Sequence, residues 1–336
     1  SLEMFIADFA HNNDLKSTQP SSKLRGKVAV IGSGPAGLTV AGDLAKMDFD
    51  VTIFEAQSEP GGVLLFGIPE FRLQKDVVRR EISELQHIGV EIRTKQLAGV
   101  DFTVDDLFAQ GYDAIFMGTG TSLPRTLDIP GKELSGILTA TYFLRMVVLA
   151  DGGKLDASET LLHTGDNVIV VGAGNVAMDA ARTAIRMGCD VTVIYRRGQE
   201  QMPAIQAEYE EAVKEGVKFW WHSTITEFLD NGEGRLGSVR IKSDDGERTE
   251  NFDRIFLAIG SRPANRIVST NEGIDVDEKG YVKVVERPSG MTTRRGVFAG
   301  GDVVHRPQTV VLAMKAAKDV ALGIEQYVDA VKLLED

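Results

Sequence analysis

A glycine-rich turn near the start of the chain has the residue types and spacing that hold the pyrophosphate of a dinucleotide. It occupies residues 32–37, GSGPAG, and is a complete G-x-G-x-x-G. In such a turn the first glycine allows a tight bend, the second lets the backbone approach the phosphates, and the third lets a helix pack closely on a strand. Glu55 follows where an acid accepts hydrogen bonds from ribose hydroxyls. These residues predict a dinucleotide site, and the alternative is a βαβ turn without a ligand.

The elements that must position this turn lie on either side of it. Residues 28–31 are an apolar run that predicts a buried strand, and residues 38–47 predict a helix. Residues 51–54 predict a second strand, which ends at Glu55. The helix would direct its N-terminal N–H groups and the positive end of its dipole at the phosphates.

The same order of elements occurs a second time. A strand, a glycine turn (GAGNVA), a helix and a strand are predicted at residues 167–171, 172–177, 178–187 and 191–195. This copy ends in Arg196 and Arg197 instead of an acid. Arginine is expected there when the ribose carries a 2′-phosphate, and the alternative is a pair of solvated arginines.

The composition bounds the class of protein. The chain has 336 residues, of which 43% are hydrophobic, and a formal net charge of −12. This length allows two domains, and the acidic charge disfavours a general role in binding nucleic acid. We recognise no membrane-length apolar run and no secretory signal peptide. The single cysteine, Cys189, excludes disulfides within the chain and cysteine-ligated metal or iron–sulfur sites. We therefore expect a cytoplasmic protein without a metal site, a nucleic-acid partner or a membrane contact.

Two dinucleotide sites with opposite charge at the ribose position indicate two cofactors. Glu55 favours FAD or NAD, whereas Arg196 and Arg197 favour NADP(H). A protein that holds both has an evident use in hydride transfer from NADPH to a flavin, and the cofactors carry that chemistry. No general acid or base is required, so we assign no catalytic side chain. His305 follows Asp302 in the sequence and is interpreted as structural.

A series of short motifs resembles one known family. In order, they are GSGPAG, FEAQSEPGG, GIPEFRL, MGTG, GAGNVAMDAARTAIRMG, VTVIYRR and FAGGDVV. Together they resemble the small (β) subunit of NADPH-dependent glutamate synthase and its relatives, which include the flavin half of dihydropyrimidine dehydrogenase and the NADPH-binding subunit of a bifurcating transhydrogenase. GIPEFRL is the most specific piece, because generic disulfide reductases do not show it.

The resemblance implies an α/β fold with two Rossmann-like domains of the disulfide-reductase type, in which the NADPH domain is inserted in the FAD domain. The expected FAD domain comprises residues 23–124 and 263–336, and the expected NADPH domain comprises residues 125–262. Residues 1–22 would be a helix and linker left from an upstream iron–sulfur domain that family members usually carry. Further helices are expected at residues 139–150, 202–215 and 309–327.

The resemblance also assigns residues to the two cofactors. On FAD it would place Gly32, Ser33, Gly34, Pro35, Ala36, Gly37, Glu55, Ala56, Gly62, Val63, Arg72, Leu97, Gly120, Gly301, Asp302, Gln308, Thr309 and Val310. On NADP(H) it would place Gly172, Ala173, Gly174, Asn175, Val176, Arg196, Arg197, Ala258, Ile259 and Gly260. Asp302 would lie near the ribityl–phosphate part of FAD. The long helix that follows would direct its N-terminus at the flavin ring.

The leading hypothesis is an FAD-containing NADPH oxidoreductase that passes electrons to the iron–sulfur centres of glutamate synthase. Its partners would be an iron–sulfur domain or subunit and the large subunit, and a homodimer could form through apolar surface left uncovered. One alternative is a ferredoxin reductase or a transhydrogenase-type electron-transfer subunit. A thioredoxin reductase would need a C-x-x-C motif, which the chain lacks. An alternative of another class is a non-catalytic nucleotide-binding subunit for redox sensing or assembly.

Overall fold

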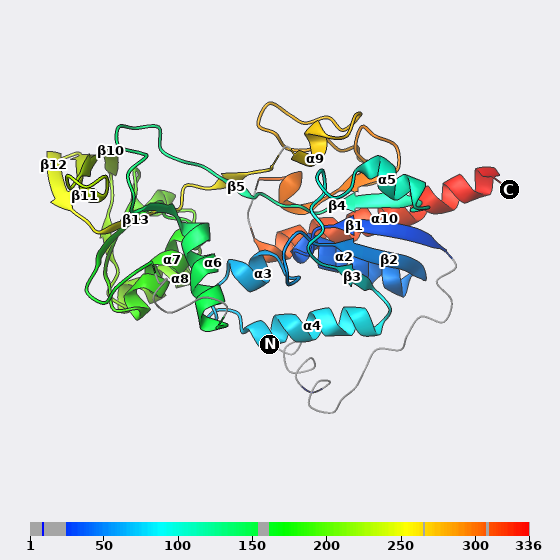
Figure 1. The fold of residues 1–336 in the computed structure, drawn as a ribbon, viewed down its shortest axis with the longest axis horizontal. Coiled ribbons are helices and arrows are strands. Elements are labelled where there is room, and N and C mark those ends of the chain that lie inside the picture. The colour runs from blue at the N-terminus through cyan, green and yellow to red at the C-terminus, as the bar shows by residue number, and fades with distance from the viewer. Residues whose placement is uncertain (1–8, 10–24, 154–160, 265, 307–308, 336) are drawn as a thin grey trace. The chain divides into compact units, whose positions relative to one another are not determined.

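A computed structural model describes residues 9, 25–153, 161–264, 266–306 and 309–335. The chain divides into two compact units. The first unit contains Ser1–Leu64, Lys75–Leu123 and Arg262–Asp336, and the second contains Leu65–Gln74 and Pro124–Ser261. In Figure 1 most of the first unit is blue, cyan, orange or red, and most of the second is green or yellow. The expected N-terminal helix and linker of residues 1–22 lie, except for Phe9, outside the described residues.

The first unit is built on a parallel five-stranded sheet in the order β15–β4–β1–β2–β3. Its strands are β1 (Gly26–Ile31), β2 (Phe49–Phe54), β3 (Glu91–Arg93), β4 (Ala114–Met117) and β15 (Val297–Ala299). The central strands are almost entirely buried, because helices and loops cover both faces of a parallel sheet. β1 is the central strand, and the first glycine turn begins at its carboxyl end.

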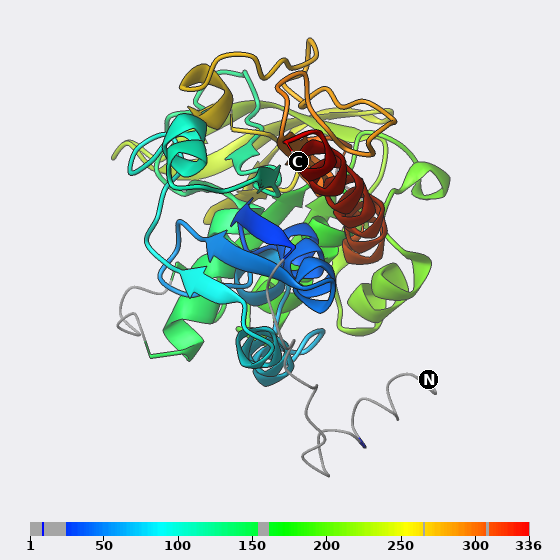
Figure 2. The same ribbon diagram turned by 90° about the vertical axis from the view of Figure 1, so that its right-hand side faces the viewer.

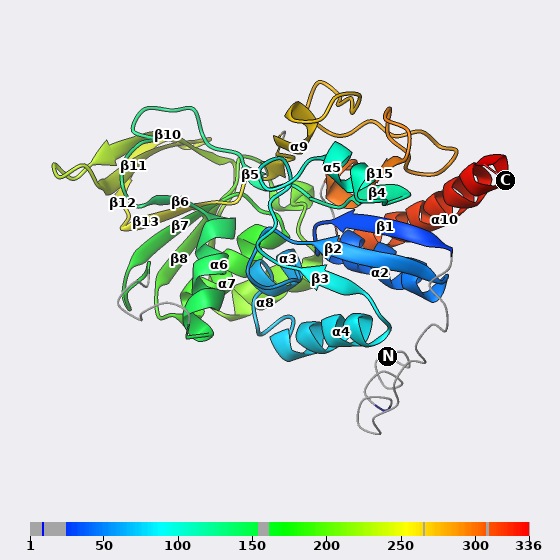
Figure 3. The ribbon, with the colours of Figure 1, turned by 45° about the vertical axis from the view of Figure 1, so that its right-hand side comes forward.

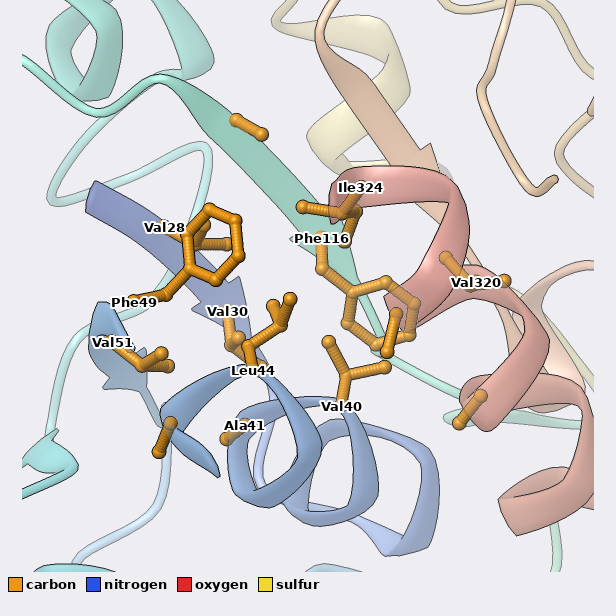
Figure 4. Packing of buried hydrophobic residues seen from close by; sticks show 14 of the residues in the cluster. Val28, Val30, Val40, Ala41, Leu44, Phe49, Val51, Phe116, Val320 and Ile324 are labelled. Carbon is orange, nitrogen blue, oxygen red and sulfur yellow. The ribbon is translucent and has the colours of Figure 1, made fainter. Parts of the chain in front are cut away.

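Helices α2 and α10 cover one face of this sheet. Val40 and Leu44 of α2 point toward Val30 and Phe116, and Ile324 of α10 belongs to the same buried cluster (Figure 4). Figure 2 views the molecule with α10 toward the reader. Helical elements that include residues of this unit are α2 (Pro35–Lys46), α3 (Val63–Phe66), α4 (Lys75–His87), α5 (Val104–Ala109), α9 (Arg266–Ser269), the 3-10 turn η3 (Gly301–Val303) and α10 (Val310–Glu335).

The second unit repeats this plan. Its parallel sheet has the order β6–β13–β7–β8–β9, with bounds Ile137–Thr139, Arg254–Leu257, Asn167–Val171, Asp190–Ile194 and Lys218–Trp220. An antiparallel sheet of β10 (Ser223–Asp230), β11 (Leu236–Ser243) and β12 (Gly246–Asn251) packs on one face. The other face carries α6 (Ala140–Asp151), α7 (Asn175–Arg186) and α8 (Gln206–Lys214), as Figure 3 shows, and the turn η2 spans Gln199–Gln201. The Phe143 ring of α6 stacks on Phe256 of β13 with ring centroids 4.0 Å apart. The predicted α/β class with two Rossmann-like domains is confirmed.

Two short strands occur where the chain passes from one unit to the other. They are β5 (Leu123–Pro124) and β14 (Ser261–Arg262), which form a two-stranded sheet. The family resemblance implies that residues 65–74 belong to the FAD domain, whereas in the structure they group with the second unit. The physical reason is that Phe71 and Arg72 contact side chains of α7 and α8.

Within the described residues, no helix combines the length and apolarity needed to cross a bilayer. Cys189 is buried in the second unit, and burial raises the pKa of its thiol to about 11. A thiol with so high a pKa is almost wholly protonated near neutral pH, as expected for a core residue rather than a redox group.

Candidate functional site

The first glycine turn is pressed against the strand beside it. Gly32 has φ of +98°, and a Cβ there would lie 2.8 Å from the carbonyl oxygen of Gly118. A Cβ on Gly37 would lie 1.9 Å from the carbonyl oxygen of Gly32. Gly118 in turn donates from its backbone N–H to Ile31 O at 2.9 Å. Strand, turn and helix therefore meet at distances that only glycine allows.

Gly34 differs from these two glycines because open space faces it. A Cβ added there would meet no atom within 4 Å. Its backbone is extended, with φ of −71°, so this position does not require glycine for conformational reasons. Gly62 borders the same place, since its own Cβ would lie 2.8 Å from Gly34 Cα. The space over Gly34, at the N-terminus of α2, fits a pyrophosphate.

Glu55 is buried behind the turn and tied to it. Its Oε2 accepts hydrogen bonds from Ser33 N at 2.9 Å and Ser33 Oγ at 2.5 Å, and its Oε1 accepts one from Gln57 N at 2.8 Å. A carboxylate accepts about four hydrogen bonds, so about one position remains for a ribose hydroxyl. The backbone N–H of Gln96 donates to the carbonyl oxygen of Glu55 at 2.9 Å, and the exposed Leu97 follows directly in the chain. This apolar neighbour suits an adenine face.

A second group of predicted flavin residues meets the start of α2. Gly301 has φ of +72°, and a Cβ there would lie 2.9 Å from Ala36 Cβ and 3.7 Å from Ala313 Cβ of α10. Asp302 is partly buried, and burial raises the pKa of its carboxyl while the charge of His305 opposes that rise. Thr309 caps α10 by accepting a hydrogen bond from Leu312 N at 3.3 Å.

Most residues assigned to FAD therefore lie at one edge of the first unit. The structure places there the residues that follow the carboxyl ends of β1, β2, β4 and β15: Gly32, Ser33, Gly34, Pro35, Ala36, Gly37, Glu55, Ala56, Gly120, Gly301 and Asp302. Gly62 and Val63 join them beside Gly34, Leu97 follows the Gln96 that hydrogen-bonds to Glu55, and Thr309 and Val310 begin α10. Gln308 lies outside the described residues. The assignment of these residues to FAD stays a prediction.

The second glycine turn has the same geometry. Gly172 has φ of +119°, and a Cβ there would lie 2.4 Å from Ala258 O at the end of β13. Open space faces Gly174, because the nearest atom to an added Cβ is Pro203 Cγ at 4.0 Å. The turn leads into α7 at Asn175 and Val176, and Ile259 and Gly260 follow Ala258. The second edge therefore also fits a pyrophosphate.

A loop that sequence reasoning did not assign packs beside this turn. Asn175 Oδ1 accepts a hydrogen bond from Ile205 N at 2.9 Å, and Ala204 N donates to Ala173 O at 3.1 Å. Pro203 lies in the same loop, next to Gly174. The sequence signal for this loop is the Met-Pro at residues 202–203, where the apolar pattern instead predicts the start of a helix.

Arg196 and Arg197 follow β8, the strand beside β7. Both side chains are exposed, and within the described part of the chain neither guanidinium forms an ion pair. Their charges are thus available to an anion at the edge that carries the second glycine turn.

Arg72, predicted to contact FAD, lies in an ion-pair network of the second unit, and its assignment to FAD stays a prediction. Its guanidinium nitrogens lie 2.7 Å from Asp179 Oδ1 and 3.0 Å from Glu208 Oε1. Arg182 continues the network to Glu208 at 2.8 Å and to Glu215 at 2.9 Å. The Asp179 side chain is only 6% exposed, and burial raises its pKa to about 6 although Arg72 opposes the rise. No sequence pattern predicts these ion pairs, because α7 and α8 lie far along the chain from Arg72.

Comparisons with known proteins agree with this arrangement. The family model described as pyridine nucleotide-disulphide oxidoreductase matches residues 26–317. The glutamate synthase [NADPH] small chain of Halomonas elongata is 33% identical over 354 residues, covering 98% of this chain and 74% of that protein. The NAD-dependent dihydropyrimidine dehydrogenase subunit PreT of Salmonella typhimurium is 32% identical over 330 residues, covering 98% of this chain and 75% of that protein. Mycobacterium tuberculosis FprA in complex with NADPH aligns with a TM-score of 0.75 at 17% identity, covering 91% of this chain and 85% of that one, and supports the fold alone.

The open space over Gly34 predicts the effect of filling it. Gly34→Ala should fold normally but bind FAD at least roughly tenfold more weakly, because its methyl group would overlap the pyrophosphate at a cost of about 1–3 kcal/mol. Gly37→Ala is the control, since its Cβ would collide with Gly32 O and destabilise the fold itself. Isothermal titration with FAD and urea unfolding of both variants separate the two effects. Undiminished FAD binding by Gly34→Ala would contradict this placement.

The raised pKa of Asp179 predicts a pH dependence of stability. Between its ordinary pKa of 3.8 and its folded-state value of about 6, the folded protein holds a proton that the unfolded chain releases. The contribution of Asp179 to the free energy of unfolding is therefore greatest below the lower value and is lost as the pH rises through the higher one. We expect wild type to lose about 1 kcal/mol relative to Asp179→Asn between pH 5 and pH 7, measured by urea unfolding. Parallel pH profiles of the two proteins would refute this expectation.

Proposed function

We propose how the work is divided in this chain, which belongs to the pyridine nucleotide-disulphide oxidoreductase family, is similar to the glutamate synthase small chains, and is a flavin oxidoreductase that uses NADP(H). Its first unit would hold FAD and its second unit NADPH, and electrons would leave the flavin for an iron–sulfur domain or subunit. When bound, the cofactors supply the hydride chemistry. The chain supplies binding, orientation and charge.

The observation that carries this assignment is the contrast between the residues beside the two glycine turns. The strand beside the first turn is followed by Glu55, which is buried and retains acceptor capacity for ribose hydroxyls. The strand beside the second is followed by Arg196 and Arg197, which are exposed and unpaired within the described residues. An acceptor suits an unphosphorylated ribose, and a pair of guanidinium groups suits a 2′-phosphate.

In the first unit the remaining residues complete the proposed FAD site. The N-terminus of α2 would face the pyrophosphate, and Asp302 would approach the ribityl–phosphate part from the turn after β15. The start of α10 lies beside Gly301 and Ala36, so the positive end of its dipole would stabilise negative charge on the flavin ring. In the second unit Asn175 would fix the loop at residues 203–205 beside the NADPH pyrophosphate.

The destination of the electrons follows from what the chain lacks. Its single cysteine is buried, so it has no dithiol through which to reduce a disulfide. Among the described residues there is no cluster of side chains that could hold a metal. We therefore place the next electron carrier on another protein or domain, and glutamate formation would need the large subunit. A ferredoxin reductase or transhydrogenase-type role differs only in that partner, whereas a non-catalytic subunit would bind NADPH without reducing flavin.

Coenzyme preference tests the assignment of the second unit. The FAD-loaded chain should be reduced by NADPH with at least roughly tenfold higher efficiency than by NADH, because charge-assisted hydrogen bonds contribute about 1.5–3 kcal/mol. Arg196→Ala/Arg197→Ala should remove most of that preference, as measured by anaerobic stopped-flow reduction with each coenzyme. Arg240→Ala, which removes an arginine paired with Glu227 in the same unit, should retain it. Equal reduction of wild type by both coenzymes would show that the arginines do not select NADPH.

A further inference from the structure

The chain passes between its two units four times, because residues 65–74 leave the first unit and return to it. The other two passages lie at β5 and β14. The base of this excursion is closed within the first unit, where buried Lys75 donates from Nζ to Leu64 O at 3.0 Å. Gly62, just before it, lies against Gly34 of the first glycine turn. Residues 65–74 are therefore a closed loop that belongs to the first unit by its ends and to the second by its contacts.

The tip of this loop is fastened to α7 and α8 by charge and by aromatic packing. Arg72 pairs with Asp179 and Glu208, as described above. The Phe71 ring lies under Arg186, with Cζ 3.9 Å from the ring centroid, and under Arg182 at 4.8 Å. Both arginines are held in turn by Glu215. The network joins three guanidinium groups to three carboxylates, so its charges balance.

The fastening depends on these contacts because the loop is not close-packed everywhere. Next to Pro69 and Phe71 lies a cavity of about 250 Å³, lined mainly by apolar side chains of α6, with Thr183 and Arg186 of α7. Because apolar packing is incomplete there, the ion pairs of Arg72 and the stacking of Phe71 on Arg186 are the contacts that hold the tip of the loop. Removing one partner of a buried ion pair leaves the other charge uncompensated, so the loss of Arg72 should release the tip.

We propose that residues 65–74 are a second tether between the two units, and that Arg72 and Phe71 are positioning residues that restrict the orientations of the second unit during hydride transfer. The inference rests on the proposed transfer from NADPH to FAD. A chain joined only at β5 and β14 could hinge about one connection, whereas a second connection elsewhere in the sequence removes some of that freedom. Restricting orientation in this way raises the fraction of encounters in which two bound reactants are aligned.

This role is distinct from direct binding of FAD by Arg72 and from simple support of the second unit. A flavin ligand would change flavin affinity or the flavin spectrum. A merely structural residue would change stability or NADP⁺ affinity. A positioning residue would lower the limiting rate of flavin reduction at saturating NADPH and leave both affinities unchanged.

The test uses the FAD-loaded chain with Arg72→Ala, Arg72→Lys and the double variant Arg72→Ala/Asp179→Asn. The double variant leaves no uncompensated carboxylate, because Glu208 keeps its pair with Arg182. It therefore tests the tether even if Arg72→Ala alone does not fold. Arg248→Ala is the matched control, because Arg248 also pairs with a carboxylate and stacks on a ring, those of Glu250 and Trp220 in the second unit. For each protein we would measure flavin content and spectrum, the NADP⁺ dissociation constant, the limiting rate, and hydrogen exchange of residues 65–74.

We expect Arg72→Ala to keep its flavin and to bind NADP⁺ within about twofold of wild type, while its limiting rate falls at least about fivefold. Amides of residues 65–74 should exchange at least roughly tenfold faster, Arg72→Lys should be intermediate, and Arg248→Ala should match wild type. Loss of flavin, an altered spectrum, or an unchanged limiting rate with faster exchange would each overturn the tether. If NADPH failed to reduce even the wild type, the proposed function would fall, while hydrogen exchange, which needs no coenzyme, would still report whether Arg72 fastens the loop.

Discussion

The close approach of backbone to backbone at the ends of two central strands is the constraint on which both candidate sites depend. At Gly32 and Gly172 a side chain would collide with the carbonyl oxygen at the end of the neighbouring strand. Because the turns are pressed back against their sheets, the N-termini of α2 and α7 face the open space over Gly34 and Gly174. In each sheet a neighbouring strand ends at the same edge as the turn. Glu55 follows β2 in the first sheet, and Arg196 and Arg197 follow β8 in the second. The same close packing thus leaves two open places that fit a phosphate, and the residues after β2 and β8 make them different.

A second feature, the Arg72 network, concerns how the sites work together rather than what each binds. Buried ion pairs contribute little net stability, since desolvation offsets their attraction, but breaking one leaves an uncompensated charge. Here they hold a loop that begins just after Gly62, beside the first glycine turn, on α7, the helix that begins at the second glycine turn. GIPEFRL, the motif that most clearly distinguishes the family in the sequence, supplies Phe71 and Arg72 to this contact.

The sequence predicted the parts of the fold that depend on neighbouring residues. The strand expected at residues 28–31 is the core of β1, and the helix expected at residues 38–47 is α2, which begins earlier because Pro35 suits the first turn of a helix. The helix expected at residues 202–215 begins only at Gln206, because the preceding residues form the loop held by Asn175. The ion pairs of Arg72 could not be predicted, since they join residues brought together only by the folded second unit. Hydrophobic periodicity and turn residues predict helices, strands and glycine turns. They do not predict which charged residues, distant in the sequence, form ion pairs.

The central claim is that the two glycine turns divide the work, the first holding the flavin and the second holding the NADPH that reduces it. The most direct measurement is an anaerobic absorbance titration of Gly174→Ala, in which a methyl group would enter the open space at the second turn only. We predict that this variant carries FAD and that dithionite bleaches its visible flavin band, whereas NADPH at concentrations that bleach the wild type does not. Bleaching of Gly174→Ala by NADPH to the same extent as wild type, or a variant that has lost its flavin, would contradict the division.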